Sequence, residues 1–236
     1  MSDLVNFFGD NAGLLGQKAL AHLGISALAI AIALVLALPV GVLLGHKHRG
    51  SYVAINVSNV LRALPSLALI AIALAIFGLS LVNVLVALVA LAIPPILTNA
   101  YTAVDKVDAD AVEAARGMGM NERQVLTVVE LPLSWPLIFA GIRTGAVYVI
   151  ARTPLAAIAG GGGLGDIILN QPTYGLAGVV AATIVTVLLA FAADAVLGFA
   201  QRRLTPTGVV LQSDLKSLVP PTESNVPSSD RAVIAQ

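Results

Sequence analysis

The residues whose types and spacing could support chemistry are few, and they match no catalytic motif. The glycine cluster GGGGLGD at 160–166 lacks the Lys-Ser/Thr pair of a phosphate-binding loop, and no strand precedes it as in a dinucleotide fingerprint. His22, His46 and His48 are the only histidines, and neither HExxH nor GxSxG occurs. The absence of cysteine excludes thiolate metal sites and cysteine nucleophiles. These observations predict a chain that is not an enzyme and carries no metal or cofactor of its own.

The composition explains why catalytic groups are scarce. Hydrophobic residues make up 58% of the 236 residues and charged residues 11%, with a mean hydropathy of +0.92. An average soluble domain carries about 25% charged residues, so this is an integral membrane protein. The net charge is zero, which gives no global field to attract nucleic acid.

Long apolar segments predict an all-α protein with five membrane spans. A span needs about 20 apolar residues, and the first segment offers 22 without a charge. The predicted spans are residues 23–44, 52–79 (interrupted by Arg62 and Pro65), 81–101, 135–159 and 176–200. We therefore expect an extracytoplasmic segment at 1–19, a transmembrane domain at 20–204 with a polar loop at 105–132, and a disordered cytoplasmic tail at 205–236.

The basic residues predict the orientation. With the N-terminus outside, the outer loops hold only Lys18, whereas the inner loops hold seven basic residues: Lys47, Arg49, Lys106, Arg116, Arg123, Arg202 and Arg203. This positive-inside bias places the C-terminus and the 105–132 loop in the cytoplasm. The sequence His46-Lys47-His48-Arg49 is interpreted as a basic loop facing lipid headgroups, because no further metal ligand stands nearby.

Four charged residues fall within the predicted spans, where each costs about 2.5 to 3.5 kcal/mol at the bilayer centre. Arg62 and Arg143 lie close enough to cytoplasmic ends to snorkel or to pair with loop carboxylates. Arg152 lies deeper, and two roles stay open for it: a pathway or gate residue, or a partner for Asp194. For Asp194 itself, local pairing with the arginines at 202–203 is favoured.

The polar stretch at 108–132 separates the third and fourth predicted spans. Asp110 stands three residues before Glu113, and Asn121 stands three residues before Gln124. These two capping boxes predict two short helices, and the glycines at 117 and 119 supply the break between them.

This stretch resembles the EAA loop of binding-protein-dependent ABC importer permeases. The matching positions are Glu113-Ala114-Ala115, then Gly119, Val129 in place of the usual isoleucine, and Leu131-Pro132. In that family the loop is a cytoplasmic coupling helix that docks into a groove on the ATPase subunit. The resemblance implies that the first four of these residues form the docking surface and that Leu131-Pro132 begins the next span.

Further segments resemble permeases of the osmoprotectant importers. They are RALPSLALIAI, the segment from PPILTNAY to the EAA-like loop, VELPLSWPLIFAGIRT and GGGGLGDII, which together cover most of 62–168. The resemblance implies a type I importer permease with a five-span, methionine-importer-like core in the plasma membrane of a prokaryote. It further implies glycine betaine, carnitine, choline or proline betaine as solute, and three kinds of partner: ATPase subunits that hold ATP and Mg, a second permease subunit and an extracytoplasmic binding protein.

Arg152 departs from the pattern of that group, which has small residues at this point. A fixed cation in the pathway would disfavour a quaternary ammonium solute unless a carboxylate neutralises it. Tyr148 is the strongest candidate for an aromatic contact with such a solute. We expect Arg152, Tyr148 and Asn99 to lie along the translocation pathway.

Two alternatives remain at this stage. A methionine-type or other amino-acid ABC importer permease shares the five-span core and a similar GGGGLGD segment, although RALPSLALI matches the osmoprotectant group better. An ion-coupled secondary transporter or small channel would need a buried carboxylate or an inverted repeat. Only Asp194 is available for that role, and no repeat is visible in the sequence.

Overall fold

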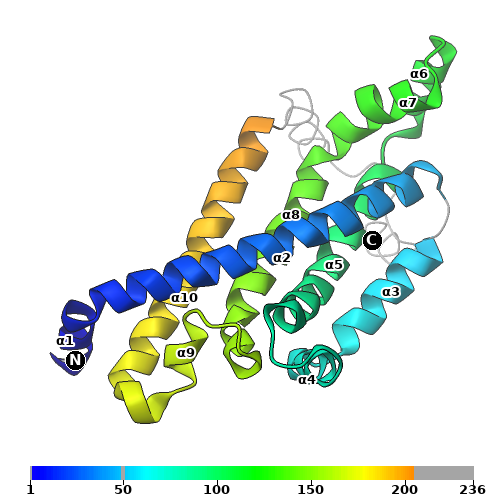
Figure 1. The fold of residues 1–236 in the computed structure, drawn as a ribbon. Helices are drawn as coiled ribbons and strands as arrows, with labels where there is room; N and C mark the ends of the chain where they lie inside the picture. Colours follow the sequence, from blue (N-terminus) through cyan, green and yellow to red (C-terminus); the bar gives the residue numbers. More distant parts are fainter. Residues whose placement is uncertain (1, 49–50, 205–236) are drawn as a thin grey trace, which may run out of the picture.

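The computed structural model describes residues 2–48 and 51–204, and every regular element within these ranges is a helix. Four helices are long and apolar enough to cross a membrane, and a bent pair brings the number to five if it counts as one span. The four are α2 (Ala12–His46), α5 (Leu81–Asp105), the helix that includes α8 (Leu131–Arg152), and α10 (Gln171–Leu204). The described part therefore confirms the predicted all-α membrane fold (Figure 1).

The predicted second span is not a single straight crossing. It consists of α3 (Ser51–Ala63) and α4 (Ser66–Phe77), whose axes differ by 91°. Pro65 lies between them with φ −59° and ψ 135°, outside the helical region. A proline disfavours helical geometry at the residue before it and cannot donate a backbone hydrogen bond, so α3 ends here. The bend brings the end of α3 and the start of α4 beside α5.

The central helix of the fold is α5, which packs against α2, α8, α3 and α4. Its neighbours approach closely because they present small residues. On α2 the buried small residues recur every four positions: Ala29, Ala33, Ala37, Gly41 and Gly45. A Cβ added to Gly41 would lie 2.7 Å from the Cβ of Ala100, and one added to Gly141 on α8 would lie 2.5 Å from the Cβ of Asn99. Small residues that allow close backbone approach are the usual basis of helix packing in membranes.

The polar stretch forms a helical hairpin that projects from one end of the bundle (Figure 1). It consists of α6 (Ala109–Gly117), α7 (Glu122–Gln124) and a π-helix (Val125–Glu130), and we call these elements the coupling hairpin. The Asn121–Gln124 capping box is present, with backbone-to-side-chain distances of 2.9 and 3.0 Å. The capping box at Asp110 is wrong, because Asp108 is the N-cap and its carboxylate accepts from the Asp110 N–H.

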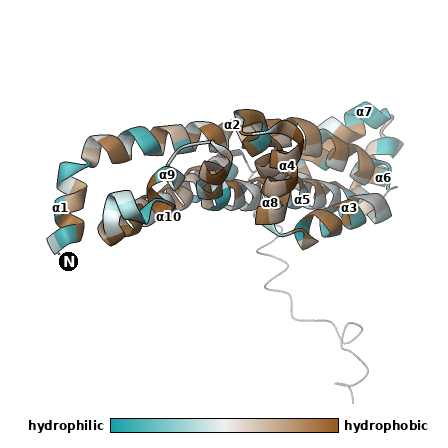
Figure 2. Ribbon diagram, turned by 60° about the horizontal axis from the view of Figure 1, so that its bottom comes forward, coloured by the Kyte–Doolittle hydropathy of each residue, from teal (hydrophilic) through white to brown (hydrophobic). Residues whose placement is uncertain are grey.

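The second short helix of the predicted pair is not separate from the next span. From Glu122 the chain continues as one helix through the π-helix into α8, which begins at Leu131 as expected. The hairpin closes on a small apolar cluster in which Val112 and Ala115 of α6 pack against Val125. Hydrophilic residues concentrate on α6 and α7 and again on α1 at the other end, with apolar helices between them (Figure 2).

At the end opposite the hairpin, α1 (Ser2–Asp10) packs against α10, and α9 (Gly165–Ile168) lies close by. The glycine cluster supplies left-handed turns at Gly160, Gly162 and Gly163, and a Cβ at Gly165 would overlap the carbonyl oxygen of Pro154. The cluster therefore allows close packing. α2 begins at Ala12 and passes without a break through the predicted boundary at residue 19. The predicted tail at 205–236 lies outside the described residues.

Candidate functional site

The three predicted pathway residues lie together around one cavity of about 610 Å³. Asn99 comes from α5, whereas Tyr148 and Arg152 lie one turn apart on α8. The end of α3 adds Arg62, and the proline bend between α3 and α4 closes one side. We call this space the arginine cavity. The structure brings the predicted residues together, and their role in transport stays a prediction.

The two guanidinium groups of the arginine cavity contact neutral partners. Arg152 lies over the ring of Tyr148, with its Cζ 4.8 Å from the ring centroid, and its Nη1 is 3.4 Å from the Tyr148 carbonyl oxygen. Arg62 donates to the carbonyl oxygen of Pro94 and to the hydroxyl of Thr98, both at 3.5 Å. Asn99 donates to the Pro95 carbonyl at 2.7 Å. The described residues that line this cavity include no Asp or Glu.

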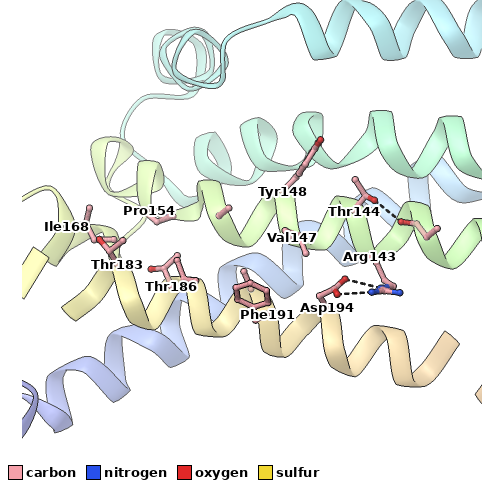
Figure 3. Close-up of a pocket in the computed structure, with 14 residues that line it drawn as sticks. Arg143, Thr144, Val147, Tyr148, Pro154, Ile168, Thr183, Thr186, Phe191 and Asp194 are labelled. Carbon is pink, nitrogen blue, oxygen red and sulfur yellow. Dashed lines mark hydrogen bonds and ion pairs between the residues drawn. The ribbon is translucent and has the colours of Figure 1, made fainter. Parts of the chain in front are cut away.

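A second space of about 800 Å³ lies between α8 and α10, and its charges are paired. Arg143 donates to both carboxylate oxygens of Asp194, at 2.9 and 2.7 Å (Figure 3). Its third nitrogen donates to Gln201 at 3.1 Å. In the same view Tyr148 points from α8 to the side opposite Asp194. The favoured pairing of Asp194 with the arginines at 202–203 is wrong, as is the alternative pairing with Arg152. Arg143 pairs with a carboxylate of another span rather than with a loop carboxylate. The two side chains meet because α8 and α10 pack side by side.

The coupling hairpin exposes only some of its predicted docking residues. Glu113, Ala114 and Gly119 are exposed, and Gly119 adopts φ +85° at the break after α6. Ala115 is 2% exposed and packs inside the hairpin. Leu131-Pro132 is half-buried at the start of α8. The exposed subset forms a surface at the projecting tip, and docking there stays a prediction.

His46 joins the end of α2 to the coupling hairpin. Its Nδ1 lies 2.6 Å from a carboxylate oxygen of Glu130, which is 1% exposed in the π-helix, and its Nε2 lies 3.4 Å from Glu122. Because Glu130 and His46 are both largely buried here, the interpretation of His46 as a headgroup-facing residue is wrong. Glu122 also accepts from Arg116 at 3.1 Å, and this hydrogen bond raises the pKa of the Arg116 guanidinium. This cluster fixes the hairpin against the first span.

Sequence reasoning missed several of these features. Met118 at the tip of the hairpin is 72% exposed, which makes it an apolar, adaptable contact beside Gly119. Its position within the EAA-like loop was a usable signal. The contact of His46 with Glu130 joins residues 84 positions apart, and no local pattern indicates it.

The described residues form cavities, fixed charges and a projecting surface. Within residues 2–48 and 51–204 no group of three or more His, Cys, Asp or Glu side chains could hold a metal ion. One of the two cavities is lined by two arginines without a carboxylate among its described lining residues, and the other holds the Arg143–Asp194 pair.

Comparison with protein families gives one assignment. Residues 33–206 match the family described as the inner membrane component of binding-protein-dependent transport systems. The match includes the coupling hairpin and both cavities.

Curated relatives cover nearly the whole chain. The choline transport system permease protein OpuBB of Bacillus subtilis is 38% identical over 214 residues, which is 89% of this chain and 97% of that protein. The glycine betaine/carnitine/choline transport system permease protein OpuCB of the same species is 37% identical with the same coverage. The osmoprotectant import permease protein OsmW of Salmonella typhimurium is 34% identical over 88% of this chain and 99% of that protein.

Among solved structures, the chain is similar to a chain of the MetNI methionine ABC transporter in an inward-facing conformation. The TM-score is 0.71 at 22% sequence identity, and the match covers 84% of this chain and 99% of that one. At this identity the likeness establishes the type I importer permease fold and nothing about the solute.

Proposed function

The chain belongs to the family of inner membrane components of binding-protein-dependent transport systems, and from that premise we propose that it imports a quaternary ammonium osmoprotectant. Glycine betaine, carnitine, choline and proline betaine are the candidate solutes. The observation that carries this proposal is the set of relatives at 34 to 38% identity, whose names specify choline, carnitine, glycine betaine or osmoprotectant transport. The methionine alternative has support only from the fold.

The partners follow from the family and from the shape of the chain. We propose that ATPase subunits bind the coupling hairpin and supply ATP and Mg, since this chain offers no nucleotide motif of its own. A second permease subunit would complete the passage, and an extracytoplasmic binding protein would deliver solute. The positive-inside bias supports an N-terminus outside and a cytoplasmic C-terminus in the plasma membrane of a prokaryote.

The proposed mechanism is a population shift driven by ATP. Closure of the ATPase subunits moves the hairpin, which is continuous with α8 through the π-helix and is held to α2 by His46. Movement of the hairpin is therefore transmitted to α2 and α8, which both pack against α5. ATP supplies the difference in binding free energy between inward-open and outward-open states that such a shift requires.

The test is uptake of radiolabelled glycine betaine, carnitine and choline in cells that express the complete transport system, with and without Glu113→Arg. Glu113 is exposed on α6, so the variant should fold and insert. We expect it to lose most ATP-dependent uptake and to lose co-purification of the ATPase. Asp10→Arg, an equal charge change at an exposed position of α1 outside the coupling hairpin, is the control and should retain both. Undiminished uptake by Glu113→Arg would refute the coupling role.

A further inference from the structure

The arginine cavity holds positive charge that no described carboxylate neutralises. Arg62 and Arg152 both line it, and neither lies within ion-pair distance of an Asp or Glu among residues 2–48 and 51–204. The sequence leaves Asp194 open as a partner for Arg152, but this carboxylate is bound to Arg143 on the other side of α8. Charged residues inside a membrane are costly and are usually paired or placed on a solute pathway.

The scaffold holds the two arginines at fixed places on different elements. Arg62 stands near the end of α3, directly before the Pro65 bend, and reaches the carbonyl of Pro94 in α5. Arg152 is the last residue of α8, before the chain tightens into the 3-10 helix Thr153–Ala159. Three helices therefore converge so that both guanidinium groups border one space.

Two cations in a cavity walled by apolar helices stabilise a ligand that brings a negative group and repel one that brings only positive charge. The planar fork of an arginine suits a carboxylate, to which it can donate two parallel hydrogen bonds. A carboxylate that binds Arg152 would compete with Tyr148 for the guanidinium. The ring face so released is the surface that favours a quaternary ammonium group.

We infer that Arg62 and Arg152 make this cavity a passage selective for quaternary ammonium solutes that also carry a carboxylate, such as glycine betaine and carnitine. Choline, which has the cation without a carboxylate, is disfavoured at this step. This inference rests on the proposed function for the identity of the solute class, whereas the charge selectivity of the cavity can be measured without it.

The experiment uses thiol labelling, because the chain contains no cysteine and an introduced one is the only thiol on it. Thr144→Cys places the thiol on the wall of the arginine cavity, at a position that also borders the space between α8 and α10. Thr183→Cys is the matched control: it is also exposed, also bonds the carbonyl four residues earlier, and lines only the space that holds the neutral Arg143–Asp194 pair. The complete importer in nanodiscs is treated with two methanethiosulfonates that differ only in carrying an ethylsulfonate or an ethyltrimethylammonium group, and the labelled permease is quantified by mass spectrometry.

The expected result is a sulfonate-to-trimethylammonium labelling ratio at position 144 that exceeds the ratio at 183 by about tenfold or more, the ratio that about 1.4 kcal/mol provides. Arg62→Gln combined with Arg152→Gln should bring the two ratios together, and Arg152→Lys should preserve the difference. Equal ratios in the presence of both arginines, or no labelling at position 144 by either reagent, would overturn the inference. Uptake assays on the same importer separate the two proposals: a preserved labelling ratio without uptake of any quaternary ammonium solute would refute the proposed function alone.

Discussion

Arg143 and Arg152 lie nine residues apart on α8, yet their surroundings differ in kind. Arg143 faces α10 and shares three hydrogen bonds with Asp194 and Gln201. Arg152 borders the arginine cavity and contacts an aromatic ring and a carbonyl oxygen of its own helix. The paired arginine joins two spans. The arginine with neutral contacts is the one that we propose acts on the solute.

The largest expected effect comes from a change that moves both arginines. Gly141 lets α8 approach α5, and a Cβ there would lie 2.5 Å from the Cβ of Asn99 and 2.8 Å from the Pro95 carbonyl oxygen. Gly141→Val should separate the helices and cost about 3 kcal/mol, the upper part of the range for overpacking. Gly24→Val is the control, because nothing lies within 4 Å of a Cβ at Gly24. The measurement is the thermal stability of the solubilised permease, and equal melting temperatures for the two variants would contradict the close packing.

Asp194→Asn should destabilise the chain by a smaller amount. The substitution leaves Arg143 without a charged partner between two spans, which costs about 1 to 3 kcal/mol of stability. We expect the lower part of that range, because solvent reaches both side chains, each of which is about a third exposed. Arg152→Gln should change stability by less than about 1 kcal/mol, because it removes only a contact with a ring and a long hydrogen bond to a carbonyl oxygen of its own helix. Denaturation of both variants side by side checks the contrast. If they lose equal stability, the distinction between the paired and unpaired arginines is wrong.

The smallest expected effects come from Tyr148. Tyr148→Phe keeps the ring face on which Arg152 rests and should leave stability and uptake unchanged. Tyr148→Ala removes the ring and should reduce uptake of glycine betaine a few-fold, since the cation–π contact is worth about 0.5 to 1 kcal/mol at an exposed site. Uptake kinetics of the two variants in the same cells give the comparison. An equal loss in both would assign the effect to the hydroxyl rather than to the ring.

Local patterns predicted those parts of the structure that depend on neighbouring residues. The apolar runs indicated the spans, and the Asn121–Gln124 capping box marks the start of α7 as expected. Tyr148 and Arg152, four residues apart, share a helix face, which the helical period requires. At Asp108 and Asp110 two similar residues compete for one cap, and the sequence does not decide between them.

The parts that sequence reasoning missed depend on packing between distant segments. Arg143 and Asp194 are 51 residues apart, and His46 and Glu130 are 84 apart, so only the arrangement of helices brings each pair together. Apolar composition shows where a membrane helix can lie, but it does not show the direction of its axis. The interruption that the sequence predicts at Pro65 within one span is therefore a 91° turn between two helices in the structure. Arg62 stands three residues before Pro65 and donates to the Pro94 carbonyl of α5, a contact between segments that no local pattern indicates.

The most direct test of the account is the ratio of glycine betaine uptake to choline uptake by the complete system with Arg152→Gln. The account predicts that this ratio falls about tenfold or more relative to the unchanged chain, at equal amounts of permease in the membrane and with Arg152→Lys close to the original ratio. An unchanged ratio in Arg152→Gln, with normal membrane levels and active uptake, would contradict the claim that the unpaired arginine selects the solute.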